Sequence, residues 1–250
     1  MARVLVLGGG VAPYLDPRHP FAAVARAVAA IGLDRGHRVE VVTDIAGRIA
    51  AGLDDVDVLV ALGPDPDPAV VGPRARQRAW TTLEARLERP VGLLGLHVGL
   101  TTLLGWPRWG ALMGARPVPG AARSGTAALG ASAAGGSGHS PHGPTVVRTL
   151  PHRLTDGAGG FRLEDEPYAG MEVTAASAVA VDHEVDRVVH PLIWTRDEGG
   201  IRIVADALGH GPASFDAPAH VAIVGRAIDW LAAATLEGIP SSRSLSPSPR

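Results

Sequence analysis

Short, unbroken apolar runs recur through the first part of the chain. They are rich in Val and Leu, which is typical of strands buried on both faces of a parallel sheet. Glycines follow the first run directly, as Gly8-Gly9-Gly10. We therefore predict strands over Val4–Leu7, Arg38–Thr43, Val56–Leu62 and Val91–Leu96.

Amphipathic segments separate these runs. Residues 20–35 place apolar side chains at helical spacing and stop at Gly36, so they predict a helix. A second helix is predicted from about Pro73 to Glu88, and a final one after Asp216 as its N-cap. Strands that alternate with helices predict an α/β fold with a doubly wound, mostly parallel sheet. Such sheets bind ligands at the carboxyl ends of their strands.

The composition changes in the second half of the chain. Residues 117–143 are mostly Ala, Gly, Ser and Pro, and we expect a flexible surface insertion there. The rest of residues 1–236 is expected to form one α/β domain, followed by a disordered tail at 237–250. Gly199-Gly200 predicts a hairpin turn. Further strands are predicted over residues 145–150, 161–168, 173–181, 189–195 and 201–208.

Composition narrows the function. The chain of 250 residues has 23 basic and 25 acidic residues, a balance that does not suit nucleic acid as a partner. It contains no Cys and no Lys, which excludes a thiol nucleophile, Schiff-base chemistry and a Walker-type phosphate loop. No apolar run approaches the roughly 20 residues of a membrane helix, so no membrane partner and a cytoplasmic location are expected.

His97 is the first candidate for chemistry. It follows the predicted strand Val91–Leu96 and lies between Gly95 and Gly99, which is the strand–turn–helix layout of a nucleophile elbow. A histidine there could act as a general base or as a metal ligand. The alternative is a histidine that only caps a helix.

Two other motifs are less specific. Gly8-Gly9-Gly10 lacks the spacing of a dinucleotide-binding loop, so a glycine-rich turn is the better interpretation. The segment Glu164-Asp165-Glu166-Pro167-Tyr168 joins carboxylates to an aromatic residue. In an extended segment Asp165 and Glu166 face opposite ways, so they cannot form a facing acid/base pair. The alternative is a solvated acidic edge.

Three histidines fall in loops after predicted strands, namely His19, His97 and His210. Together with Asp44, Asp165 or Glu166 they could hold a divalent metal, although no paired metal-binding spacing is present. Each could instead be structural. His139 and His142, in the insertion, are weaker candidates. We interpret the other histidines as surface or structural residues: 37, 152, 183, 190 and 220.

Several motifs, taken in order, resemble the trehalose-utilisation (ThuA-like) family over roughly residues 3–232. They are His19-Pro20-Phe21, Gly92-Leu93-Leu94-Gly95-Leu96-His97, Asp165-Glu166-Pro167-Tyr168, and Pro191-Leu192-Ile193-Trp194-Thr195-Arg196 leading to Leu208-Gly209-His210. The resemblance implies a flavodoxin-like three-layer sandwich, similar to class I glutamine amidotransferases without their nucleophilic Cys. It also implies a link to the catabolism of trehalose or related disaccharides.

The resemblance also implies site residues. Two departures from the family pattern are present: Arg153 replaces a usual His-Pro, and the insertion leaves a family histidine ambiguous between His139 and His142. Carried over by position, the site residues are His19, His97, Asp165, Glu166, Tyr168, Arg196 and His210, and Trp194 adjoins Arg196.

The resulting hypothesis is an enzyme that acts on a disaccharide or keto-sugar by acid/base catalysis, as a hydrolase, lyase or isomerase. The alternative is a non-catalytic sugar-binding or regulatory module, since fold does not determine function. A small-molecule sugar is the expected partner, a homo-oligomer could form, and a divalent metal is the one cofactor that could be needed. The expected catalytic residues are His97, His210, Asp165 and Glu166, and the expected substrate contacts are His19, Tyr168, Trp194 and Arg196.

Overall fold

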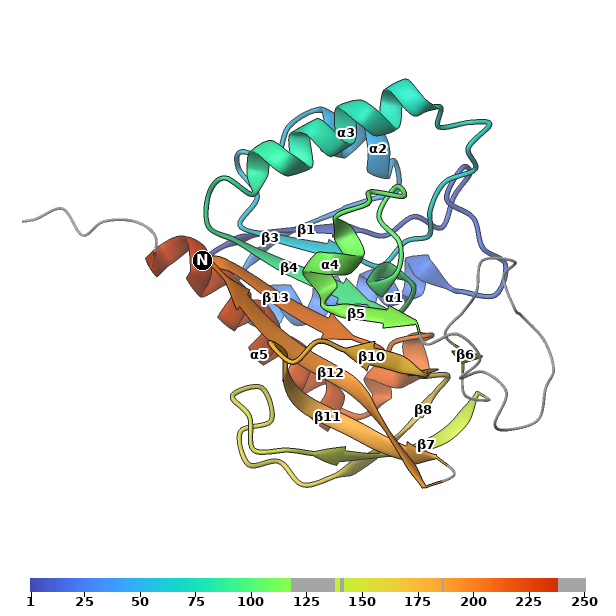
Figure 1. Cartoon of the computed structure of the whole chain (residues 1–250), viewed down its shortest axis with the longest axis vertical. Helices are drawn as coiled ribbons and strands as arrows, with labels where there is room; N and C mark the ends of the chain where they lie inside the picture. The colour runs from blue at the N-terminus through green and yellow to red at the C-terminus, as the bar shows by residue number, and fades with distance from the viewer. Residues whose placement is uncertain (118–137, 140–141, 186, 238–250) are drawn as a thin grey trace, which may run out of the picture.

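The structure is a computed structural model that describes residues 1–117, 138–139, 142–185 and 187–237. Most of the predicted insertion and residues 238–250 of the predicted tail lie outside these ranges. A nine-stranded sheet forms the centre of the molecule (Figure 1). Its strand order is β2-β1-β3-β4-β13-β12-β11-β7-β8.

One half of the sheet is parallel, as the sequence predicts. Its strands are β1 (Arg3–Leu7), β2 (Arg38–Val42), β3 (Val58–Ala61), β4 (Val91–Leu96) and β13 (Ile201–Asp206). Every residue of β3 and β4 is buried, because helices cover both faces of this half. The carboxyl ends of β1, β4 and β13 therefore meet at one edge.

The other half is antiparallel, which corrects the expectation of a mostly parallel sheet. The predicted hairpin at Gly199-Gly200 is confirmed: both glycines have positive φ, and β13 turns back along β12. Such short turns leave no room for a crossover helix, so the joined strands must run antiparallel. This half contains β12 (Val188–Glu198), β11 (Ala178–Val185), β7 (Gly143–Thr149) and β8 (Phe161–Asp165).

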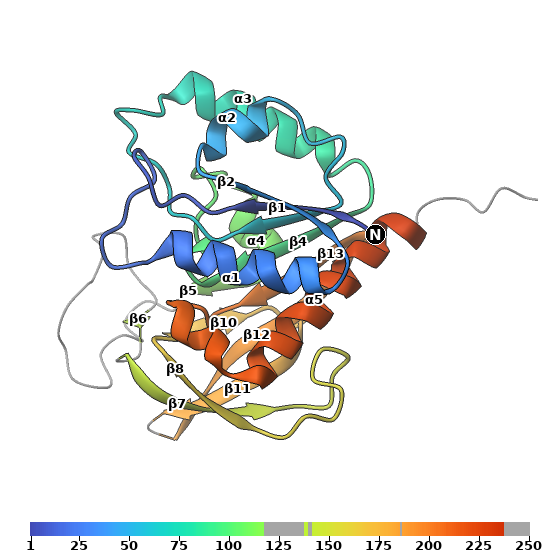
Figure 2. The same ribbon diagram turned by 180° about the vertical axis from the view of Figure 1, so that it is seen from behind.

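Helices lie on both faces of the sheet. α1 (Phe21–Asp34) and α5 (Pro218–Glu237) cover the face seen in Figure 2. α4 (Trp109–Met113) lies in front of β4 and β13 in Figure 1. α2 (Ile45–Ala50) packs beside α3 (Pro73–Arg86). No helix in the described ranges has the length and apolar character needed to cross a bilayer.

Two local expectations need correction. Asp216 does not cap the last helix, because it ends a short 3-10 helix, η3 (Pro212–Asp216), and Pro218 opens α5. The segment predicted as one strand over 173–181 forms two, β10 (Met171–Val173) and β11, with a turn between them. β10 pairs with β5 (Ala115–Pro117), and β9 (Tyr168–Ala169) pairs with β6 (Gly138–His139).

Candidate functional site

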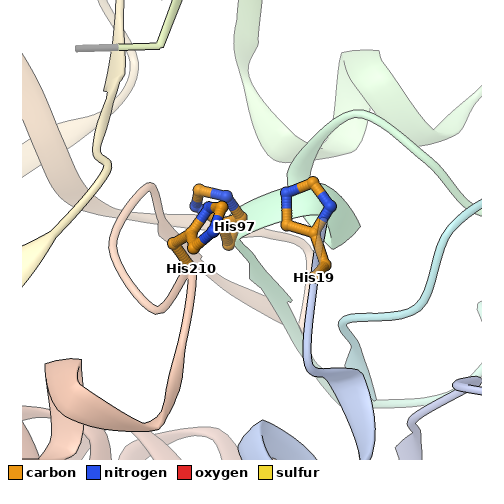
Figure 3. Close-up of side chains that lie close together, drawn as sticks. All are labelled: His19, His97 and His210. Carbon is orange, nitrogen blue, oxygen red and sulfur yellow. The ribbon is translucent and has the colours of Figure 1, made fainter. Parts of the chain in front are cut away.

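Three histidines converge at the carboxyl edge of the parallel strands. His19 lies in the loop between β1 and α1, His97 directly follows β4, and His210 lies in the loop after β13 (Figure 3). Their ring centroids are 4.6 to 5.3 Å apart. One ring nitrogen from each residue lies within 4.8 Å of the other two. The expectation that these loops meet is therefore confirmed for all three side chains.

The backbone after β4 presents His97 to this edge. His97 has a φ of +47° and opens η1 (His97–Leu100), so the predicted strand–turn–helix layout is present, with a short 3-10 helix. A Cβ at Gly99 would lie 1.8 Å from the Ala61 carbonyl oxygen, so only glycine fits this close approach. The buried His97 ring points its Nδ1 at the Ala207 carbonyl oxygen, 3.4 Å away. A carbonyl can only accept, so Nδ1 carries the proton and Nε2 carries the lone pair.

Asp16, which sequence reasoning missed, orients His19. The Nδ1 of His19 lies 2.8 Å from Oδ2 of Asp16, and its ring stacks on Phe21 at 5.4 Å between centroids. Burial raises the pKa of Asp16, but hydrogen bonds from the Arg18 amide and from His19 outweigh it and leave that pKa below its usual value. The ionised carboxylate favours the Nδ1–H form of His19. In the sequence, this contact is indicated only by the position of Asp16 three residues before His19.

Asp165 holds the loop that carries His210. Its carboxylate is fully buried and accepts hydrogen bonds from the backbone amides of Glu166, Gly209 and His210, at 2.7, 2.8 and 3.1 Å. The Ser214 hydroxyl donates a further bond at 2.8 Å. With its acceptor sites occupied in this way, Asp165 is placed to position the loop rather than to touch a substrate.

Glu166 faces the cluster from the same segment. Its Oε2 lies 3.6 Å from Nδ1 of His210. Burial lowers the pKa of His210, and the nearby Glu166 carboxylate only partly opposes this, so the pKa lies below its usual value. His210 is therefore neutral at pH 7 and can accept a proton.

Two more side chains border the cluster. The Tyr168 ring centroid lies 4.8 Å from that of His97, and burial raises the pKa of Tyr168 to about 12, so its phenol stays protonated. The exposed His142 ring lies 5.8 Å from His210. The backbone of His139 pairs with that of Tyr168.

Trp194 and Arg196, expected as substrate contacts, anchor α4 instead. The buried Trp194 indole donates to the Met113 carbonyl oxygen at 2.7 Å. The Arg196 guanidinium donates to the Leu112 carbonyl oxygen at 2.8 Å. Asp44, a candidate metal ligand, is likewise engaged elsewhere, since it caps α2 through the Gly47 amide. In the described residues, all three side chains thus hold α4 or α2 through backbone groups.

A family model described as trehalose utilisation, ThuA, matches residues 3–231. The chain belongs to the ThuA family. The family resemblance that the sequence motifs indicated is thereby confirmed over nearly the whole chain. No curated protein sequence matches the chain.

Solved structures show how the ThuA fold extends beyond the family. A ThuA-like protein from Bacteroides uniformis superposes with a TM-score of 0.64 at 15% identity, covering 92% of this chain and 91% of that one. A glutamine amidotransferase from Thermotoga maritima gives 0.54 at 10% identity, with 92% and 98% covered. A β-galactosidase from Rahnella sp. R3 gives 0.53 at 11% identity, but this chain covers only 32% of it. At these identities the likeness establishes the amidotransferase-like fold alone.

Proposed function

We propose that this ThuA protein is an enzyme of trehalose or related disaccharide utilisation, and that the three-histidine cluster is its active site. The convergence of His19, His97 and His210 at one edge, beside Glu166 and Tyr168, carries the proposal. The family supports a role in trehalose utilisation, and the substrate and the reaction class are our inference. We infer a hydrolase, lyase or isomerase that transfers protons without a covalent thiol intermediate.

The side chains suit distinct roles in this chemistry. His97 has its Nδ1 held by a backbone carbonyl, so its Nε2 can accept a proton from a sugar hydroxyl or from a carbon beside a ketone. His210, neutral and next to Glu166, can exchange a second proton. The protonated Tyr168 phenol can donate a hydrogen bond to a sugar oxygen. We assign Asp165 a positioning role under the His210 loop.

Turnover by matched variants tests this function. The wild type, His97→Gln and His210→Gln are incubated with trehalose and with its 3-keto derivative, with and without an added divalent metal, and products are followed by NMR. We expect the wild type to convert one of these sugars and each substitution to lower kcat/KM by about 10²- to 10⁴-fold, the usual contribution of a general acid or base.

His37→Gln is the control. It makes the same substitution just before β2, at the amino-terminal edge of the sheet, where Nε2 of His37 contacts Asp229 at 2.9 Å. We expect it to keep wild-type turnover. If the wild type binds a sugar by calorimetry but converts neither under any condition, the chain is a sugar-binding or regulatory module instead.

A further inference from the structure

We propose that His19, His97 and His210 together bind one divalent transition-metal ion of the Zn²⁺ type. The inference rests on the proposed function in that it concerns the same site. One nitrogen from each ring lies within 4.8 Å of the other two. Zinc bound tetrahedrally at 2.0–2.1 Å requires ligand nitrogens about 3.4 Å apart. Side-chain rotations that move each nitrogen by about an ångström would close the site around an ion.

The second observation is the set of groups behind the rings. Metal-bound histidines almost always donate their other ring N–H to a carboxylate or a backbone carbonyl, which fixes the tautomer and raises ligand basicity. His19 makes such a contact with Asp16 at 2.8 Å, and His97 makes one with the Ala207 carbonyl at 3.4 Å. In both residues Nε2 is then the ring nitrogen that would bind the metal, and with an ion bound Glu166, rather than His97 Nε2, would take up the proton in the proposed reaction.

A second pair of neighbouring histidines in the described ranges does not share these features. His183 and His190 also lie close together, with ring centroids 5.5 Å apart. Nδ1 of His190, however, accepts the Gly170 amide. No third histidine or carboxylate completes a metal-ligand group with this pair in the part of the chain that the structure describes. The cluster of His19, His97 and His210 therefore differs from a chance pair of neighbouring imidazoles by its third ligand and by the contacts behind its rings.

The ligand set selects the class of metal. Three imidazoles suit Zn²⁺, Ni²⁺, Co²⁺ and Cu²⁺, whereas Mg²⁺ and Ca²⁺ require oxygen ligands. Three protein ligands also leave a fourth position for water or a substrate oxygen, as in catalytic zinc sites. Glu166 stands beside His210 and Tyr168 beside His97, so the cluster carries a carboxylate and a phenol at its border.

Metal titration of the full chain tests the proposal without reference to turnover. Tag-free protein is stripped with a chelator and titrated with Zn²⁺ by calorimetry, and with Co²⁺ by absorption spectroscopy. We expect one equivalent per chain, a tetrahedral Co²⁺ spectrum, and a higher melting temperature with metal. Each of His19→Gln, His97→Gln and His210→Gln should weaken binding by about 100-fold or more.

Asp16→Asn provides an independent test, because Asp16 is not a proposed ligand. Weakening the contact behind His19 should lower the affinity by about 10- to 100-fold. His37→Gln should bind the metal like the wild type. The proposal is overturned if the stripped chain binds no stoichiometric Zn²⁺ or Co²⁺, or if the ligand variants bind as the wild type does.

The two proposals fail separately. Turnover of a sugar by metal-free protein, with no metal uptake, would remove the metal site and leave the enzyme. Stoichiometric metal binding without turnover of any offered sugar would leave the metal site and remove the proposed reaction.

Discussion

Asp165 and Glu166 are neighbours in the chain, but their carboxylates meet different surroundings. Asp165 is fully buried among N–H and O–H donors, whereas Glu166 is half-buried and faces His210. The alternation expected of an extended segment places them on opposite sides. At the residue scale, one carboxylate therefore supports the site and the other borders it.

Replacing the Asp165 carboxylate by an amide of similar size should destabilise the fold. In Asp165→Asn, an amide NH₂ would face the Gly209 N–H and the Ser214 O–H, which leaves a buried donor unpaired. We expect a loss of about 2–4 kcal/mol in the free energy of unfolding, measured by urea denaturation. The exposed neighbour serves as control, since Glu164→Gln should change stability by less than about 0.5 kcal/mol. Equal effects of the two variants would contradict the assigned role of Asp165.

At the scale of elements, the turn between β4 and η1 determines where His97 lies at the edge of the sheet. The β4 strand is wholly buried, and η1 packs so closely on β3 that Gly99 approaches the Ala61 carbonyl. The elbow is therefore held by backbone packing, and the side chain of His97 can face the cluster.

A methyl group at the elbow should displace it. Gly99→Ala forces η1 away from Ala61, and we expect a loss of about 3 kcal/mol or more. Gly110→Ala, in α4, has open space around its new methyl group and should be neutral or slightly stabilising. Thermal unfolding of both variants measures the difference, and similar melting temperatures would show that η1 moves freely.

The elements differ in how far the sequence predicts them. The parallel strands could be predicted because a strand buried on both faces consists of consecutive apolar residues. The direction of the later strands depends on connection length, which such runs do not encode. The histidine cluster was predictable because the carboxyl ends of parallel strands share one edge. Trp194 bonds a backbone carbonyl, and Asp165 bonds three backbone amides besides the Ser214 hydroxyl, and backbone groups leave no signal in the residue pattern.

At the scale of the whole molecule, both halves of the sheet form one hydrogen-bonded body. A buried group of the antiparallel half that must take up a proton on unfolding therefore affects the stability of the entire fold. His183 on β11 is such a group: it is buried, and burial together with the neighbouring His190 lowers its pKa to about 4. The buried His220 has the opposite tendency, because Asp206 outweighs its burial and raises its pKa.

His183 makes the fold sensitive to acid. The unfolded chain binds a proton at His183 near pH 6.5, but the folded chain does so only near pH 4, so stability falls as the pH drops through this window. The stabilisation from His220 is fully present below pH 6.5 and does not vary there. Urea denaturation from pH 7 to 4 should show a loss of stability, and His183→Leu should reduce that loss by on the order of 2 kcal/mol. An identical pH profile for the variant would exclude His183 as the cause.

The positive φ of His97 sets stability against the proposed activity at a single position. A non-glycine residue in this region of backbone space costs about 1 kcal/mol, and glycine or asparagine would relieve it. A library selected for heat resistance alone would therefore drift away from histidine at residue 97. A library selected for the proposed sugar turnover would retain it.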